Sequence, residues 1–97
     1  MDEKTVNKLL TLFCESAQTD IKNLESQIAT LEFEQIHNIS HKLKAGVRYF
    51  FLDALSTQLE QMQHASKNRD AQLVLNLFDE IKPGFTQVIS DLKKKLS

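Results

Sequence analysis

Hydrophobic residues recur every three or four positions along almost the whole chain, which is the spacing of one face of an α-helix. The first series predicts a long helix over residues 3–29, with the apolar face Val6, Leu10, Phe13, Ala17, Ile21, Leu24, Ile28 and Leu31. The helical phase then slips, so a second helix is expected over residues 32–51. Thr30 is read as its capping residue, followed by acidic side chains in the first turn. Its predicted inner face is Phe33, Ile36, Ile39, Leu43, Val47 and Phe50.

Two further series follow the same spacing. Asp53, read as a cap, precedes a helix over residues 53–67 that buries Leu55, Leu59 and Met62. The polar stretch 66–70 turns the chain, and a last helix is expected over residues 70–96. Its predicted inner face is Leu73, Leu77, Ile81, Phe85, Val88, Leu92 and Leu96. Because proline removes a backbone hydrogen bond, Pro83 makes this segment either one kinked helix or two stacked helices, and the unbroken phase favours the kink.

Four amphipathic helices joined by short connections predict one all-α domain over residues 1–97, folded as an antiparallel up-down four-helix bundle. The composition agrees with this fold, since the chain holds 2 glycines and 1 proline where average usage would supply about a dozen. Hairpins and glycine-rich phosphate loops are therefore disfavoured. With 41% hydrophobic and 26% charged residues the chain has the composition of an ordinary globular domain.

Charge and cysteine content narrow the expected partners and location. The formal net charge is −1, and the run Lys93 to Lys95 is too short to serve as a nucleic-acid patch. The single Cys14 cannot close an internal disulfide, and no apolar run is long enough to cross a membrane or to act as a signal peptide. We therefore expect a cytoplasmic monomer without nucleic-acid or direct membrane contact, either free-standing or as the cytoplasmic part of a larger membrane-bound protein.

The informative side chains are those that the apolar faces do not use. His41 lies about 160° from the centre of the second helix's inner face, so it should point to solvent. The same outward strip carries Asn38, Lys44, Ala45 and Arg48. A neutral imidazole is a nucleophile, and Lys44 and Arg48 would lie within reach of a phosphoryl group placed on it. Taken alone, the strip is more typical of a solvated surface histidine beside scattered cations than of a reactive site.

Residues 40–50, SHKLKAGVRYF, resemble the signature of histidine-containing phosphotransfer (HPt) domains, in which the reactive histidine is followed by a lysine and small residues. The similarity extends to LLTLF in the first helix, the pair Glu32 and Phe33, Leu55, and the LEQMQ run that ends at Gln63. Two positions depart from the family pattern. The usual Lys-Gly pair is Lys44-Ala45, with the glycine displaced to Gly46, and Phe51 replaces a glycine ahead of the third helix.

The resemblance implies that His41 accepts a phosphoryl group from a receiver-domain aspartyl phosphate and passes it to another receiver aspartate. Lys44 would neutralise the phosphoryl oxygens, and Gln63 would orient the imidazole from the next helix. Lys67 and Arg48 would extend a positive docking surface, with Asn38 and Ala45 beside it. The partners would be response-regulator receiver domains and a hybrid sensor kinase that contains the domain. No cofactor is expected on this chain, because Mg²⁺ would be held by the receiver.

An enzyme that phosphorylates itself from ATP is not expected. The chain contains no Walker-type or kinase glycine-rich sequence, and no proline follows His41 in the pattern of sensor-kinase dimerisation helices. Two alternatives remain. A degenerate HPt bundle would dock partners without being phosphorylated. A metal site built on Glu34, His37 and His41 would need a second Glu-x-x-His motif, which the chain lacks.

Overall fold

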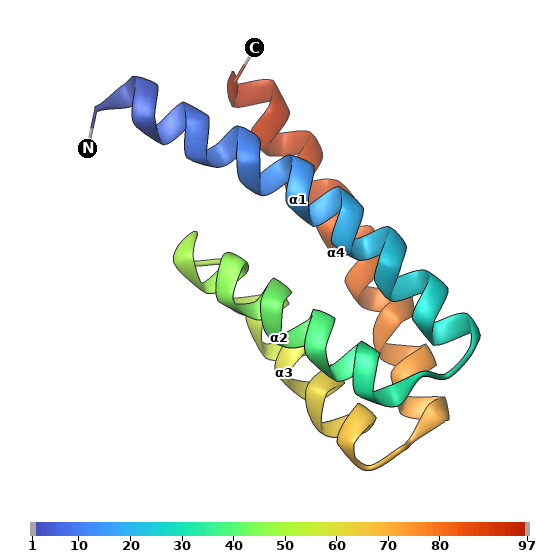
Figure 1. Cartoon of the computed structure of the whole chain (residues 1–97). Helices are drawn as coiled ribbons and strands as arrows, with labels where there is room; N and C mark the ends of the chain where they lie inside the picture. Colours follow the sequence, from blue (N-terminus) through green and yellow to red (C-terminus); the bar gives the residue numbers. More distant parts are fainter. Residues whose placement is uncertain (1, 97) are drawn as a thin grey trace.

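The computed structural model describes residues 2–96, and in them it contains four helices and no strand. They are α1 Glu3–Ala29, α2 Phe33–Tyr49, α3 Asp53–Lys67 and α4 Ala71–Leu96, and consecutive helices run in opposite directions (Figure 1). The expected all-α antiparallel four-helix bundle is therefore confirmed. Met1 and Ser97, which the predicted domain 1–97 includes, lie outside the described residues.

The three turns all use a left-handed residue other than glycine. Leu31, Phe51 and Arg69 have φ angles of 51°, 60° and 54°. At the end of α2, the amide of Leu52 donates a hydrogen bond to the carbonyl of Val47 at 2.9 Å. The amide of Phe51 donates another to the carbonyl of Arg48 at 3.1 Å. This pair of hydrogen bonds defines a Schellman C-cap, a motif in which the left-handed position is usually glycine. Phe51 therefore ends the helix, so α2 stops at Tyr49 instead of the predicted residue 51.

Both predicted N-caps are wrong for the same reason. Thr30 is the C-cap of α1, and its hydroxyl donates to the Glu32 carboxylate at 2.9 Å. Glu32 and Leu52 occupy the N-cap positions of α2 and α3, without side-chain capping bonds, and Asp53 is already the first helical residue. At these two turns the residue that follows the left-handed one, Glu32 or Leu52, takes the N-cap position, so neither Thr30 nor Asp53 can occupy it. At the third turn the equivalent residue, Asp70, does cap its helix, because its carboxylate accepts a hydrogen bond from the Leu73 amide at 3.1 Å.

The last helix is continuous from Ala71 to Leu96 with Pro83 inside it, so the single-helix interpretation holds over that of two stacked helices. Gly84, the next residue, faces α3 closely. A Cβ atom added at Gly84 would lie 3.0 Å from Leu55 Cδ2. Because glycine has no Cβ atom, Leu55 of α3 can approach the backbone of α4 at this point.

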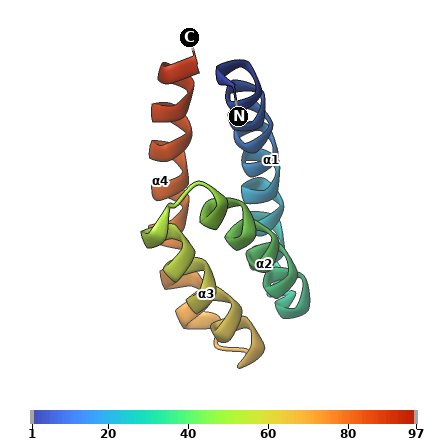
Figure 2. The same ribbon diagram turned by 90° about the vertical axis from the view of Figure 1, so that its left-hand side faces the viewer.

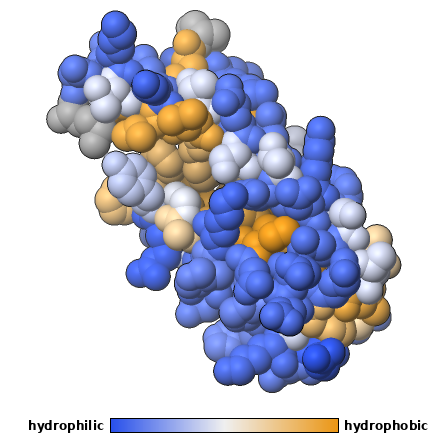
Figure 3. Space-filling model, viewed as in Figure 1, coloured by the Kyte–Doolittle hydropathy of each residue, from blue (hydrophilic) through white to orange (hydrophobic). Residues whose placement is uncertain are grey.

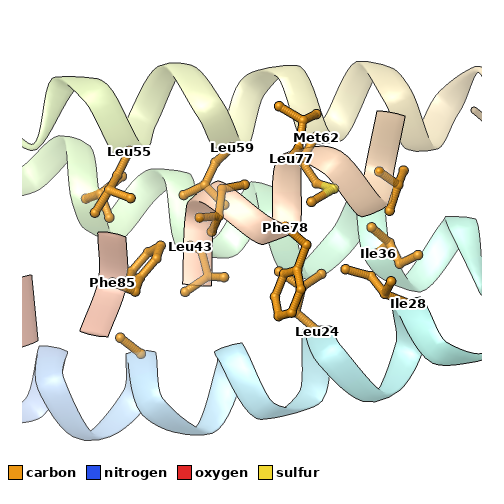
Figure 4. Packing of buried hydrophobic residues seen from close by; sticks show 14 of the residues in the cluster. Leu24, Ile28, Ile36, Leu43, Leu55, Leu59, Met62, Leu77, Phe78 and Phe85 are labelled. Carbon is orange, nitrogen blue, oxygen red and sulfur yellow. The ribbon is translucent and has the colours of Figure 1, made fainter. Parts of the chain in front are cut away.

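The core lies between the four helices, where side chains from all of them point toward one another (Figure 4). Three predictions of the apolar faces are wrong, because Val6, Leu31 and Leu73 are exposed. Other buried residues were not among the predicted inner positions: Cys14, Ala65, Val74, Phe78 and Ile89. The inner face of α4 is rotated and wider than a single stripe, because the helix packs against both α1 and α3. Burial also raises the pKa of the Cys14 thiol.

The four helices differ in length, and this gives the molecule two halves. The outer pair α1 and α4 have 27 and 26 residues, whereas α2 and α3 have 17 and 15. The longer pair therefore extends past the turn between α2 and α3 (Figure 2). We call residues 3–10 of α1 and 88–96 of α4 the arm. The remaining part, in which all four helices are side by side, is the four-helix body.

Candidate functional site

The exposed imidazole of His41 lies on the side of α2 that faces α3. Its Nδ1 is 3.1 Å from the side-chain amide nitrogen of Gln63, which comes from α3. Gln63 directly follows Met62, a fully buried core residue, so the packing of α3 sets where the amide emerges. The predicted proximity of Gln63 and His41 is therefore present in the structure. Nδ1 is engaged by this contact, whereas Nε2 has no hydrogen-bond partner among residues 2–96.

His41 lies in an open hollow of about 330 Å³ between α2 and α3. The hollow brings together the predicted residues His41, Lys44, Gln63 and Lys67. It is also lined by residues to which the sequence assigned no role there: His37, Glu60 and His64. The lining thus contains two lysines, one carboxylate and all 3 histidines of the chain. Such a polar, solvent-open surface suits a transient contact with a charged group better than a bound apolar ligand.

Helix periodicity could have identified the additional lining residues. Glu60, Gln63, His64 and Lys67 follow one another at intervals of three, one and three positions, which places them along one side of α3. His37 precedes His41 by one helical turn. Periodicity alone does not say which side of α3 faces the histidine. The family resemblance indicated that side through Gln63, and the packing of α3 against α2 places Glu60 and His64 on it as well.

The other predicted strip residues do not enter this hollow. Asn38, Ala45 and Arg48 are exposed on α2, in agreement with the wheel, but none of them lines the hollow around His41. Arg48 lines a different hollow, at the end of α2 near the arm. Lys44 is half-buried against α3, so the strip is less uniformly exposed than predicted.

The opposite side of α2 is attached to α1. Asp20, only 6% exposed, accepts a hydrogen bond from Lys42 Nζ at 3.1 Å and one from the Ser16 hydroxyl at 3.4 Å. A Cβ atom at Gly46 would lie 3.3 Å from the ring of Phe13, so α1 and α2 are in close contact there. The sequence indicated no role for Asp20, because a buried carboxylate in an apolar face is recognised only when its cation is seen. The residue following His41 is thus held in place from α1.

The structure does not provide a metal site around His37 and His41. In the part of the chain that is described, no group of three His, Cys, Asp or Glu side chains is arranged to hold a metal ion.

Two other features lie apart from the hollow. The Thr5 amide donates a hydrogen bond to the Asp2 carboxylate at 2.8 Å and lowers the pKa of that carboxyl group, at the start of α1. None of the described helices is long and apolar enough to span a membrane.

These features define a helical-bundle protein with an exposed histidine in a cationic hollow between two antiparallel helices. The chain belongs to the Hpt domain family, whose model matches residues 8–94. No significant match was found among curated proteins or among solved structures. Family membership assigns the chain a role in phosphorelay signal transduction, as a histidine phosphotransfer module of two-component systems. Members of the family interact with response-regulator receiver domains.

Proposed function

We propose that His41 accepts a phosphoryl group from the aspartyl phosphate of one receiver domain and passes it to the aspartate of another. The observation that carries this proposal is the pairing of Nδ1 with Gln63, while Nε2 has no partner within residues 2–96 and the ring is exposed. An acceptor must expose one ring nitrogen to the incoming phosphorus and be oriented through the other. Family membership supports the same role.

The step requires no group that the two proteins lack. His41 Nε2 attacks phosphorus in line, the nitrogen–phosphorus bond forms, and the bond from phosphorus to the aspartate oxygen breaks. The receiver's aspartate leaves as a carboxylate with the bonding electron pair. The hydrogen on Nδ1 stays on the ring, so the phosphorylated imidazole carries a positive charge. Donation to the second receiver is the reverse of this step.

Gln63 would set the reactive form of the ring. Nε2 has a free electron pair only when the hydrogen of the neutral imidazole is on Nδ1. A half-turn of the Gln63 amide places its oxygen against Nδ1, where it accepts that hydrogen. The same half-turn moves the amide nitrogen to the buried position where the Gln63 oxygen has no hydrogen bond in the described part of the chain. Gln63 is thus a positioning residue in this proposal.

The cations around the ring would stabilise the transferred group. Lys44 and Lys67 line the same hollow as His41, and their ammonium groups can neutralise the phosphoryl oxygens. Asn38, Ala45 and Arg48 form the adjacent exposed surface of α2, against which a receiver would dock. Ala45 is small, so a partner's backbone can approach closely.

The chain would need no cofactor of its own, because the receiver supplies Mg²⁺ at its aspartate. We propose a cytoplasmic setting, where receiver domains and the kinases that phosphorylate them are found. A degenerate domain that docks receivers without accepting phosphate is the competing proposal. The complete set of His41, Lys44 and Gln63 within one hollow favours transfer over docking alone.

The test is incubation of the chain with a receiver labelled as its aspartyl phosphate. We expect label to appear on the chain as an acid-labile, base-stable phosphohistidine. His41→Gln should abolish the transfer while helical content and melting temperature stay nearly unchanged, since the side chain is exposed. The matched control is His64→Gln, which removes a second exposed histidine from the same hollow and should keep the transfer.

Two results would contradict the proposal. Label that persists in the His41→Gln variant would place the acceptor elsewhere. Binding of receivers to the wild-type chain without any phosphohistidine, across a panel of receivers, would favour the degenerate docking domain.

A further inference from the structure

Phe51 combines two unfavourable features that the fold of a single chain does not require. Its side chain is 86% exposed, the largest value among the exposed large hydrophobic residues. Its φ angle of 60° lies in the left-handed region, where a Cβ atom is disfavoured and glycine is the usual residue. A glycine there would end α2 equally well and would expose no apolar surface. The exposed phenylalanine is therefore better explained by contact with another molecule than by the fold of one chain.

An apolar hollow lies directly beside this side chain. It is lined by Val6 and Leu9 of α1 and by Arg48, Tyr49, Phe50 and Phe51 at the end of α2. Tyr49 is 58% exposed and Val6 38%. The space-filling view shows apolar surface gathered between the N-terminal part of α1 and the end of α2 (Figure 3). The exposed aromatic ring and a hollow that could receive such a ring are thus adjacent on one surface.

The arm continues the apolar pattern of the body without the helices that cover it there. Val88, Leu92 and Leu96 extend the inner face of α4, and Leu10 that of α1, and all four are only half-buried. Val88 and Leu92 still pack against the core, and Ile89 between them is buried, so the uncovered part of the arm lies toward its end. In the body, the same faces are covered by α2 and α3, which end before the arm begins. The arm therefore has the sequence pattern of half of a four-helix bundle.

The exposed area is large for a chain of this size. The chain exposes 6279 Å², whereas a compact protein of 11.1 kDa exposes about 5,700 Å². The excess of about 600 Å² approaches the roughly 800 Å² that each partner buries in a stable complex of standard size. The molecule is also elongated, with extents of 43 × 19 × 19 Å.

We propose that the partner of this surface is a second copy of the chain, bound through the arm and the Phe51 turn about a two-fold axis. A two-fold interface needs a surface that is complementary to itself, and here each copy offers a projecting ring and a hollow side by side. Phe51 of each copy would enter the hollow of the other. The two arms would supply the four helices that neither arm has alone. This departs from the monomer expected from the sequence.

The dimer would leave the phosphotransfer site open. The hollow around His41 lies on the α3 side of α2, whereas Val6 and Leu9 approach the end of α2 from α1. The two surfaces share no lining residue. Self-association would therefore leave both His41 hollows open on one particle, although Arg48, which belongs to the proposed receiver-docking surface, also lines the hollow used by the dimer.

Sedimentation equilibrium of the full chain, from the low micromolar to the millimolar range, tests the proposal. The wild-type mass should rise with concentration from 11.1 kDa toward twice that value. Phe51→Gly should weaken the dimer by about tenfold or more, because it removes an aromatic anchor. It should also raise the melting temperature at the dilute end of the range, since it relieves the left-handed backbone. A variant that dissociates but is more stable cannot be explained by misfolding.

A second variant and a control complete the design. Val6→Glu places a charge in the hollow and should also give a monomer. Leu75→Glu changes a leucine of similar exposure near the start of α4, away from the arm, and should keep the dimer. A wild-type mass of one chain over the whole range overturns the proposal, as does equal loss of dimer in Leu75→Glu. A monomer in which Phe51→Gly weakens receiver binding would assign the surface to the receiver.

Discussion

The two sides of α2 are built in different ways. Toward α1, the helix is attached by the Asp20–Lys42 ion pair and by Gly46 beside the ring of Phe13, around a small hollow of about 100 Å³. Toward α3, the helix packs closely elsewhere, but the space beside His41 is an open hollow of about 330 Å³ with polar and charged walls. The comparison indicates that a reactive side chain can remain exposed and still be well oriented. The helix that carries it is held by its core face, by its packing against α3 and by the ion pair with α1.

The largest expected effect concerns the core face that lies between these two sides. Leu43, two residues after His41, is 4% exposed. Leu43→Ala should lower the free energy of unfolding by about 2–4 kcal/mol, because buried contacts are lost and a cavity remains. Urea unfolding followed by circular dichroism measures this loss. A decrease below about 1 kcal/mol would mean that α2 is held by its two sides more than by its core face.

An intermediate effect is expected on the α1 side. Asp20→Ala removes the buried carboxylate, while Lys42, whose side chain is 65% exposed, can turn to water. We expect a loss of about 1 kcal/mol, less than for a pair buried on both sides. The same urea experiment checks it, and transfer to His41 should be unchanged. Slower transfer in the folded variant would show that the two sides of α2 are coupled.

The smallest effect on stability, but a clear one on transfer, is expected on the α3 side. Lys44→Ala should change the free energy of unfolding by less than about 0.5 kcal/mol. Transfer should slow by about tenfold or more, because one charge-assisted hydrogen bond to the phosphoryl group is lost. Rapid-quench transfer from a labelled receiver measures this rate. The matched control is Lys42→Ala, a lysine of the same helix on the α1 side, which should keep the rate.

Equal slowing by Lys42→Ala and Lys44→Ala would mean that general positive charge on α2 matters and that the hollow does not. Slowing confined to Lys44→Ala would sharpen the distinction between the two sides.

The periodicity of apolar residues predicted much of the fold and part of the candidate site. The spacing of apolar residues predicted four helices, because an amphipathic stripe is a local property of the chain. The same spacing predicted that His41 is exposed, since its angle to the stripe depends only on helix geometry. It failed at Thr30 and Asp53, where the chain reverses through left-handed Leu31 and Phe51. Such residues have no sequence signal when glycine is absent.

The contents of the hollow could be predicted only in part. Lys44 shares a helix with His41, so its proximity follows from the sequence alone. Glu60 and His64 reach the hollow through the way α3 is rotated against α2, which is a property of two packed helices. Asp20 became recognisable only with Lys42 at 3.1 Å, because a contact over 22 positions cannot be read from local spacing.

The sequence by itself therefore determined the helices, the bundle and the outward histidine, all of which follow from the 3.6-residue period of a single helix. The tertiary structure decided which further side chains of α3 reach the hollow beside His41, how α1 holds α2, and that α1 and α4 extend beyond their neighbours as an arm. These features depend on the relative rotation and length of packed helices. Long-range packing sets them, and no single segment of the chain contains that information.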